Sequence, residues 1–253
     1  MTRNIVFVDT FSSAAAACAR LGATSVAERK VLAMDMELIC DGTTASLIQF
    51  AVSDLEVYIF DVTVLGQELF NACYLLPILT GPHIIKLCYD CRVDADILFT
   101  NHGVLVHGLY DMQIVYTSLF QTPHDPYLKG LNKAVRKIMS PTASDRFAFK
   151  KQTMKKCFSS SSNSLKTEIM RQRPLSQETL EYCADDTTVL LAMFAAWHSA
   201  FAMDAVLYSS RQRAIIHRLR KCRGKQSSSR KPPPLKAMHH VDFDQLLPLF
   251  NVS

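Results

Sequence analysis

The sequence predicts a single α/β domain with a mixed β-sheet flanked by helices and a basic, disordered C-terminal tail. Three strand-like runs follow one another early in the chain, and helical patterns dominate the remainder. No internal repeat is evident. The segment between Arg211 and Lys236 holds ten basic residues and no acid. We therefore place the domain at residues 1–208 and the tail at 209–253.

Composition supports one large folded domain. The chain has 253 residues, of which 49% are hydrophobic, and its net charge is +5, so a sizeable core is expected. The eight cysteines are scattered without the spacing of a small disulfide framework, which favours a reducing compartment. No run approaches the ~18–20 continuous apolar residues of a spanning helix, so we expect no membrane association.

The first half of the chain is predicted to be rich in strands. The stretch NIVFVDT (4–10) has strand composition, and Ser12 or Ser13 is expected to cap the Ala-rich helix that ends at Gly22. The runs KVLAMDMEL (30–38), TASLIQFAVS (44–53) and EVYIFDV (56–62) are separated by short turn-like stretches. They predict three strands joined as a meander.

Helices are predicted to dominate the second half. The helical patterns are broken by one short strand, HIIKLC, and cover residues 66–79, 93–103, 111–120 and 128–139. The pattern then dissolves into a segment rich in Lys and Ser, which we expect to be a flexible loop over residues 141–164. Ser176 is the expected N-cap of a long helix, and a further helix after Ala205 leads into the tail.

Two acids interrupt the apolar run VLAMDMELIC. In a strand, Asp35 and Glu37 point to the same face, because side chains alternate. Two carboxylates on one buried face repel each other and are costly to desolvate unless a cation neutralises them. Hard oxygen ligands suit Mg²⁺ or Mn²⁺. The alternative is a strand at the sheet edge whose acids are solvated.

Two further patterns carry acids at helical spacing. Asp90 and Asp94 lie at i and i+4 around the end of a predicted strand and the start of a helix. Tyr182 and Asp186 lie at i and i+4 on one face of the long helix. Taken singly, each is weak, since acids near helix starts are common.

The order D-x-E, D-x-x-x-D and Y-x-x-x-D resembles the DEDDy branch of the 3′–5′ exonuclease family, which includes RNase D, Werner-type and Egalitarian-like domains. SLIQFA (46–51), YDMQIV (110–115) and RPLS (173–176) also resemble family segments. The resemblance covers roughly residues 4–201, and the motif sequences are most similar to those of the Egalitarian-like branch. It implies an RNase H-like fold with a mixed sheet of roughly five or six strands.

The resemblance also implies a site. Its metal ligands would be Asp35, Glu37, Asp94 and Asp186, and Tyr182 would orient the attacking water. Two divalent ions, Mg²⁺ or Mn²⁺, held ~3.5–4 Å apart would stabilise both the attacking and the leaving oxygen. The implied activity is metal-dependent 3′–5′ exoribonuclease hydrolysis that releases nucleoside 5′-monophosphates, for instance in trimming small noncoding RNA.

Basic segments could supply the salt-sensitive part of single-strand binding. The candidates are Lys150, Lys151, Lys155, Lys156, Arg211, Arg213, Arg218 and Arg220. The alternative is that the tail only keeps the protein soluble or directs its import into the nucleus. RLRKCRGK and SRKPPP resemble nuclear import signals and favour localisation in the nucleus, with the cytoplasm or the mitochondrion as alternatives. The apolar segment DFDQLLPLF near the C-terminus could dock a protein partner or be the last packed segment of the domain.

Competing functions stay open at this point. RNA is preferred over DNA by analogy alone, because no residue reads the 2′-hydroxyl. One alternative is a catalytically silent RNA-binding adaptor of the same fold, and another is a 3′–5′ DNA exonuclease. The presence of all four acids and the tyrosine argues against the silent adaptor.

Overall fold

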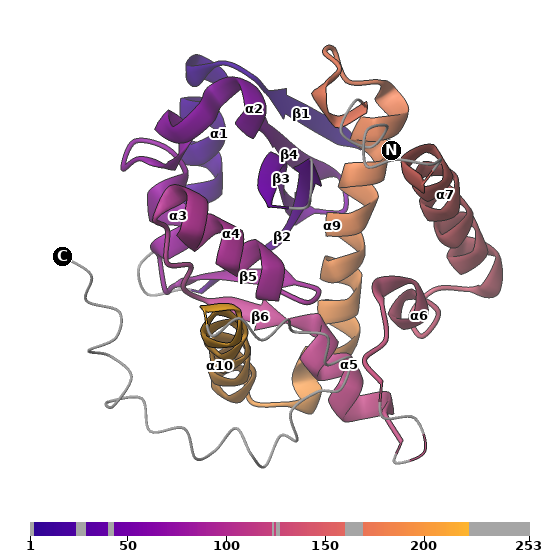
Figure 1. Cartoon of the computed structure of the whole chain (residues 1–253). Helices are drawn as coiled ribbons and strands as arrows, with labels where there is room; N and C mark the ends of the chain where they lie inside the picture. Colours follow the sequence, from indigo (N-terminus) through magenta and orange to yellow (C-terminus); the bar gives the residue numbers. More distant parts are fainter. Residues whose placement is uncertain are drawn as a thin grey trace.

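The computed structural model contains one six-stranded mixed sheet with helices on both faces (Figure 1), as the sequence predicts. It describes residues 3–23, 29–39, 43–122, 124, 127–159 and 169–222; side chains are described except at 153–159 and 222. The strands are β1 (Asn4–Val8), β2 (Lys30–Ile39), β3 (Thr44–Ser53), β4 (Glu56–Asp61), β5 (Ile84–Cys88) and β6 (Leu109–Asp111).

The sheet places β2 in its interior. The strand order is β1-β4-β3-β2-β5-β6. Strands β2, β3 and β4 pair antiparallel as the predicted meander, whereas β1 pairs parallel with β4, β5 with β2 and β6 with β5. Because β2 is an interior strand and Glu37 is only 5% exposed, the alternative of a solvated edge strand for the acids of β2 is wrong.

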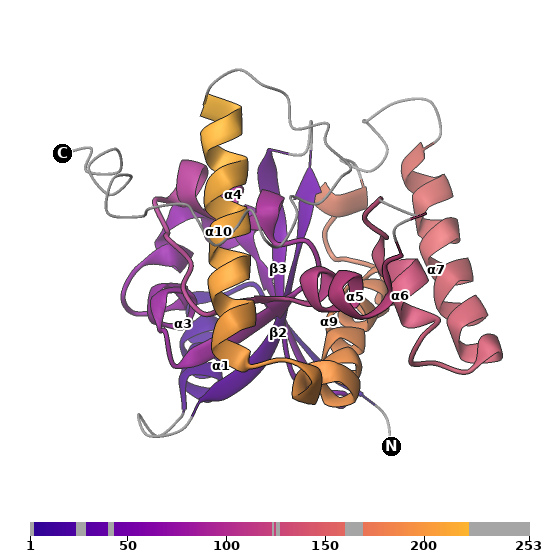
Figure 2. The same cartoon turned by 90° about the horizontal axis from the view of Figure 1, so that it is seen from below.

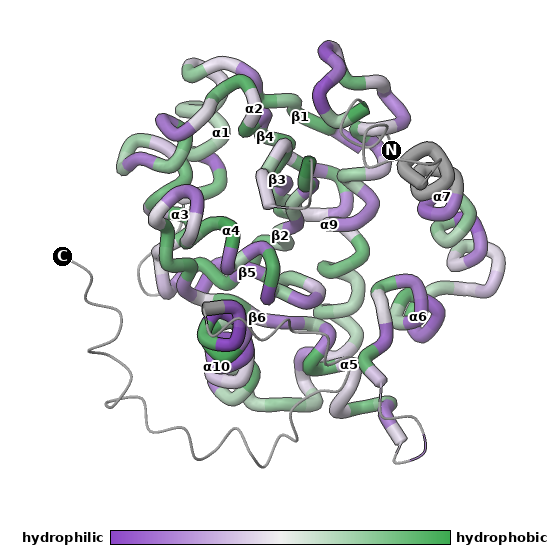
Figure 3. The backbone as a smooth tube through the Cα atoms, viewed as in Figure 1, coloured by the Kyte–Doolittle hydropathy of each residue, from purple (hydrophilic) through white to green (hydrophobic). Residues whose placement is uncertain are grey.

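Helices cover the two faces of the sheet as separate layers (Figures 1 and 3). Residues of β2 alternate between them: Met34 and Met36 pack into one apolar cluster, and Ala33 and Ile39 pack into the other. The first cluster holds α1 (Phe11–Gly22), α2 (Val62–Leu65), η1 (Gly66–Phe70), α3 (Leu75–Thr80) and α4 (Arg92–His102). The second holds α5 (Met112–Phe120), α6 (Leu131–Val135), α7 (Pro141–Ser159) and α9 (Gln177–Trp197).

The expected boundary of the domain falls inside a helix. The short η2 (His198–Ala200) is followed by α10 (Met203–Cys222), which packs against α4 and β6 and closes the β6 side of the sheet (Figure 2). The folded unit therefore continues beyond residue 208 to residue 222. Residues 223–253, which hold the rest of the predicted tail, lie outside the described residues.

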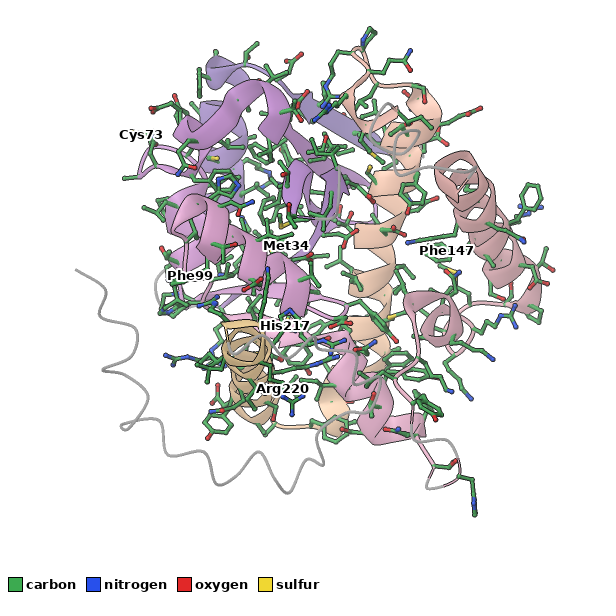
Figure 4. All side chains as sticks on the ribbon, in the orientation of Figure 1. Met34, Cys73, Phe99, Phe147, His217 and Arg220 are labelled. Carbon is green, nitrogen blue, oxygen red and sulfur yellow. The ribbon has the colours of Figure 1, made fainter. Side chains whose placement is uncertain are left out.

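The segment predicted as a flexible loop is a helix over most of its length. Residues 141–159 form α7, whereas 160–164 lie outside the described residues. Local sequence pattern does not reveal this helix because, among its described side chains at 141–152, only Ser144 and Phe147 are buried, and Phe147 packs between α7 and α9 (Figure 4). A helix with so few apolar contacts shows little hydrophobic periodicity.

Local signals place the helix starts. Ser176 caps α9 as predicted, with Thr179 N donating to its Oγ at 3.2 Å. The cap of α1 is Thr10 instead of Ser12 or Ser13: Ser13 N donates to Thr10 Oγ1 at 3.2 Å, and Thr10 N donates to Ser13 Oγ at 3.2 Å. This reciprocal pair is a capping box.

Helix α9 is the central helix of its layer, and many of its residues are buried. Within the described part of the chain, no single helix is long and apolar enough to cross a membrane. The helical segments 177–200 and 203–221 pass that test only together, as a bent pair, on length and composition.

Strand β5 carries a lysine that is entirely buried. Lys86 is 0% exposed, and its Nζ donates to the carbonyl oxygens of Ile78 and Gly81, each at 3.0 Å, at the end of α3. Burial lowers the pKa of Lys86 to about 7. A neutral amine has two N–H groups, which match these two carbonyls. Gly108 (φ 63°) provides the space for the Lys86 side chain, because a Cβ at Gly108 would lie 2.5 Å from Ile84 O and 3.4 Å from Lys86 Nζ.

Lys86 should make stability depend on pH above neutrality. Its folded-state pKa lies near 7 and its ordinary value is 10.5, so between these values the unfolded chain binds more protons. Unfolding free energy should therefore rise with pH, by up to about 1.4 kcal/mol per pH unit. Urea unfolding from pH 7 to 10 should show this rise in the wild type relative to Lys86→Met. Parallel profiles for the two proteins would mean that Lys86 stays charged when buried.

Candidate active site

Strand β2 presents two carboxylates to α9. Asp35 and Glu37 occupy the odd positions of β2, the side on which Ala33 and Ile39 pack into the α9 cluster. The pairing of β2 with β3 shifts between Glu37 and Leu38, a local irregularity of the kind that re-aims side chains. The predicted common face of the two acids is therefore confirmed.

Helix α9 adds a third carboxylate to the same place. One oxygen each of Asp35, Glu37 and Asp186 lies within 4.8 Å of the other two. Oxygens on opposite sides of one hard cation are separated by roughly 4–5 Å, since each lies ~2.0–2.6 Å from the ion. Glu37 and Asp186 are 5% and 3% exposed. These three side chains, from two separate elements, match the donor set of a single Mg²⁺ or Mn²⁺.

The fourth predicted ligand lies close by but outside this cluster. Asp94 stands in the first turn of α4 and is not among the three acids whose oxygens lie within 4.8 Å of one another. Burial first, then Asp90 and Glu37, raise the pKa of Asp94 to about 7. Asp94 also contributes to the raised pKa of Asp35. Three of the four acids thus form one cluster, and Asp94 lies beside it.

Burial and neighbouring charges disfavour ionisation of Asp35 and Asp186 when no cation is bound. Burial, followed by the charges of Asp186 and Asp94, raises the pKa of Asp35 well above its usual value. Burial also raises the pKa of Asp186 to about 6, although Lys151 opposes the shift. Asp186 Oδ1 is buried and accepts no hydrogen bond from any described residue. A buried oxygen of this kind is available as a metal ligand, so the residues fit the implied ions.

Tyr182 stands one helical turn before Asp186 on α9. Burial and the neighbouring charges of Glu37 and Asp186 raise the pKa of its phenol above the ordinary value. The hydroxyl therefore keeps its proton at neutral pH and can donate a hydrogen bond. The predicted i, i+4 placement of Tyr182 and Asp186 beside the acids of β2 is consistent with these mutual influences.

A lysine enters the acid cluster from α7. Lys151 Nζ forms a close ion pair with Asp186 Oδ2, and its side chain is 14% exposed. The ammonium also lies 5.1 Å from the ring centre of Tyr182. Burial opposes its charge, but Asp186 and Asp35 outweigh that effect and raise the pKa of Lys151. The sequence predicts Lys151 as a nucleic-acid contact and gives no sign that it reaches the carboxylates.

A buried ionic network supports the turn that carries Asp94. Arg213 of α10 contacts Asp111 at 2.6 Å and Asp90 at 3.2 Å. The Asp111 carboxylate also accepts from Asp90 N at 2.9 Å and from Cys91 N at 3.3 Å. Asp90 has a positive φ of 66°, which is uncommon for a residue other than glycine. These bonds hold the link between β5 and α4, and hence the start of α4.

A second buried pair anchors the segment that leads into α9. Arg173, within the RPLS stretch, donates through Nη2 to Asp61 Oδ1 at 2.7 Å and through Nε to Oδ2 of the same carboxylate. Its Nη1 donates to Met170 O at 2.9 Å. Because Asp61 is 0% exposed at the end of β4, this bidentate pair ties the segment before α9 to the sheet.

Two predicted nucleic-acid contacts are wrong. Arg213 and Arg218 are 5% and 7% exposed, and Arg218 Nε lies 3.8 Å from Asp96 Oδ1 while its guanidinium covers the Phe99 ring at 3.8 Å. Both arginines hold α10, the helix that carries the labelled His217 and Arg220 in Figure 4, to the domain. The reason is that their acidic partners lie roughly a hundred residues away in sequence and are invisible to a local count of charges.

The other predicted contacts remain predictions. Arg211 and Arg220 are exposed. The side chains of Lys155 and Lys156 lie outside those described. Lys150 is exposed and lines a cavity of about 500 Å³ together with Arg3 and Arg146. Both Arg3 and Lys150 contact Asp185, at 2.6 and 2.9 Å, so the acid beside Asp186 is paired with cations.

Comparisons with known proteins give a family match. A family model described as 3′–5′ exonuclease matches residues 5–198. The piRNA biogenesis protein EXD1 of Xenopus laevis is 28% identical over 174 residues, which make up 67% of this chain and 37% of that protein. The chain therefore spans well under half the length of this curated relative.

Solved structures share the fold. RNase D of Trypanosoma brucei, in complexes with GMP and with RNA U12, superposes with TM-scores of 0.69 and 0.67 at 22% identity, covering 85% of this chain and 64% and 71% of those chains. NrnC of Brucella melitensis with bound Mg²⁺ gives 0.60 at 17% identity, covering 90% of this chain and 98% of that chain.

Replacing Arg213 should destabilise the protein strongly. Arg213→Gln leaves Asp111 and Asp90 without their buried partner, which costs about 3–5 kcal/mol. Exposed Arg211, on the same helix, is the matched control, and Arg211→Gln should change stability by no more than about 0.5 kcal/mol. Urea unfolding at pH 7 measures both. Equal stabilities of the two variants would contradict a supporting role for the buried network.

Proposed function

This chain belongs to the 3′–5′ exonuclease family, and on that premise we propose that it is a metal-dependent exoribonuclease. It would remove nucleoside 5′-monophosphates from the 3′ end of single-stranded RNA. The observation that carries the proposal is the set of three carboxylates, from β2 and α9, whose oxygens lie within 4.8 Å of one another. Such a set is costly to bury unless cations are bound to it.

Each residue has a distinct part in the proposed reaction. Asp35, Glu37 and Asp186 would hold one divalent ion, and Asp94 would help to hold a second. Bound divalent ions supply charge stabilisation at the phosphate and make water a nucleophile near neutral pH. Tyr182 keeps its phenolic proton and would donate it in a hydrogen bond that aligns the attacking water.

RNA as the substrate class is supported by the relatives. T. brucei RNase D has been solved with RNA U12, and EXD1 is described as a piRNA biogenesis protein. Trimming of small noncoding RNA is the process we propose. For localisation we propose the nucleus, from the basic motifs of the tail, and for DFDQLLPLF a role in protein docking. A silent RNA-binding adaptor of the same fold is the second candidate, because a lysine already pairs with Asp186 in the three-acid cluster.

Loss of one ligand should abolish cleavage without abolishing binding. On 5′-labelled single-stranded RNA with Mg²⁺ or Mn²⁺, the wild type should give a ladder of shortened products, and EDTA should abolish it. Asp35→Asn should cut more than about 100-fold more slowly, since even residues behind metal ligands cost ~10- to 100-fold when mutated. Asp54→Asn, an exposed acid between β3 and β4, is the control and should cut normally.

The same assay separates the candidate functions. RNA binding by the wild type without cleavage in any metal would favour the adaptor. A ladder on single-stranded DNA but not RNA would favour the DNA exonuclease. Cleavage by Asp35→Asn at the wild-type rate would refute the assignment of the site.

The cavity beside α7 should contact the RNA backbone. Arg146 is exposed and lines this cavity with Lys150 and Arg3, so Arg146→Gln should weaken RNA binding and reduce the salt slope by about 1. Arg20→Gln, on α1 at the opposite face of the sheet, should leave the slope unchanged. Fluorescence anisotropy between 50 and 200 mM salt, a range of about fourfold chosen for counterion release, measures both. Identical slopes for the wild type and Arg146→Gln would exclude the cavity from the RNA path.

A further inference from the structure

We propose that Lys151 is a built-in counter-cation that occupies the carboxylate site in the ion-free protein and must withdraw when metal binds. The proposal rests on the proposed metal site and adds to it a competition between one residue of α7 and the ion. A consequence is that binding of metal and binding of RNA are coupled through this lysine.

The position of Lys151 is that of an internal cation. Its Nζ contacts Asp186 Oδ2 closely, and Asp186 belongs to the three-acid cluster. Two aromatic rings border the ammonium, with centres 5.1 Å away for Tyr182 and 5.7 Å away for Phe147. With 14% of its side chain exposed, Lys151 is far more enclosed than a lysine on a solvated helix face.

Charge explains why the lysine is there and why it would leave. One ammonium cannot balance the carboxylates of Asp35, Glu37 and Asp186, so the site still attracts cations. A divalent ion held by all three would stand next to an ammonium that engages Asp186 Oδ2, and like charges at such short range repel strongly. Occupation of this cluster by the ion therefore disfavours the present position of Lys151.

The withdrawal requires little rearrangement. A lysine ammonium sits on a flexible four-carbon stem, so a change of side-chain torsions suffices. The next residue back, Lys150, already points elsewhere, to Asp185 at 2.9 Å and the cavity shared with Arg3. Once released, the Lys151 ammonium stays tethered beside the site, where the phosphates of an incoming strand are its natural partners. Bound RNA would thus draw Lys151 away from Asp186 and favour binding of the metal ion.

Metal binding without RNA is the first test, with Lys150→Met as the matched control. Titration calorimetry with Mn²⁺, the wild type and each variant measures affinity directly. Lys151→Met should bind Mn²⁺ about tenfold more tightly than the wild type, a size usual for coupling between two sites. Lys150→Met should bind it like the wild type, because its ammonium does not touch the three-acid cluster. Lys151→Arg, which keeps the charge, should also stay near the wild-type affinity.

The second test measures coupling and stability. A single-stranded oligoribonucleotide with a hydrolysis-resistant 3′-terminal linkage, present at saturation, should raise the Mn²⁺ affinity of the wild type severalfold. Lys151→Met should lose most of that gain. By thermal melting, the rise in Tm from EDTA to Mn²⁺ should be larger for Lys151→Met than for the wild type. A purely structural lysine would lower Tm equally in both conditions.

The outcomes separate this proposal from the proposed function. If the wild type binds no divalent ion, the metal-dependent function itself fails. If the wild type binds Mn²⁺ but Lys151→Met binds it no more tightly, the counter-cation proposal alone is refuted. An equal gain of affinity in Lys150→Met would also refute it, since that result would mean a diffuse effect of positive charge on α7.

Discussion

Three carboxylates meet in one cluster beside a fourth, and much of the structure serves to hold them there. Asp35 and Glu37 come from the middle of the sheet, Asp186 from α9 and Asp94 from the first turn of α4. Their mutual repulsion and desolvation favour the protonated forms, as the raised pKa values of Asp35, Asp94 and Asp186 show. Carboxylates that repel one another must be held in place by the structure around them.

Those supports are two arginines, the buried Arg213 and the half-buried Arg173, which hold the elements that carry the acids. Arg213 fixes the link between β5 and α4 through Asp111 and Asp90, and Arg173 ties the segment before α9 to Asp61 of β4. Neither arginine is paired with a member of the four-acid group. Each has its own acidic partners, so the two arginines hold the elements that carry the four acids without pairing with the acids themselves.

Local periodicity predicts two relations of the site, each within a single element, whereas the grouping of Asp35, Glu37, Asp94 and Asp186 is predicted only from the family resemblance. Strand alternation put Asp35 and Glu37 on one face, and the spacing of a helical turn put Tyr182 beside Asp186. The helical nature of α7 and the roles of Arg213, Arg218 and Lys86 could not be predicted in this way. Their partners come from distant elements, or, for Lys86, are backbone carbonyls that leave no trace in the pattern of residue types.

The role of each basic residue in this chain is therefore set by the partner that it contacts in the fold. Consecutive lysines on α7 make the point: Lys150 reaches Asp185 and Lys151 reaches Asp186, which are consecutive on α9. Neighbouring residues of a helix point about 100° apart, so only one of the two lysines can face the three-acid cluster. The packing of Phe147 into the α9 cluster sets that rotation. The register of α7 on α9 thus decides which lysine enters the acid cluster and which stays beside the cavity.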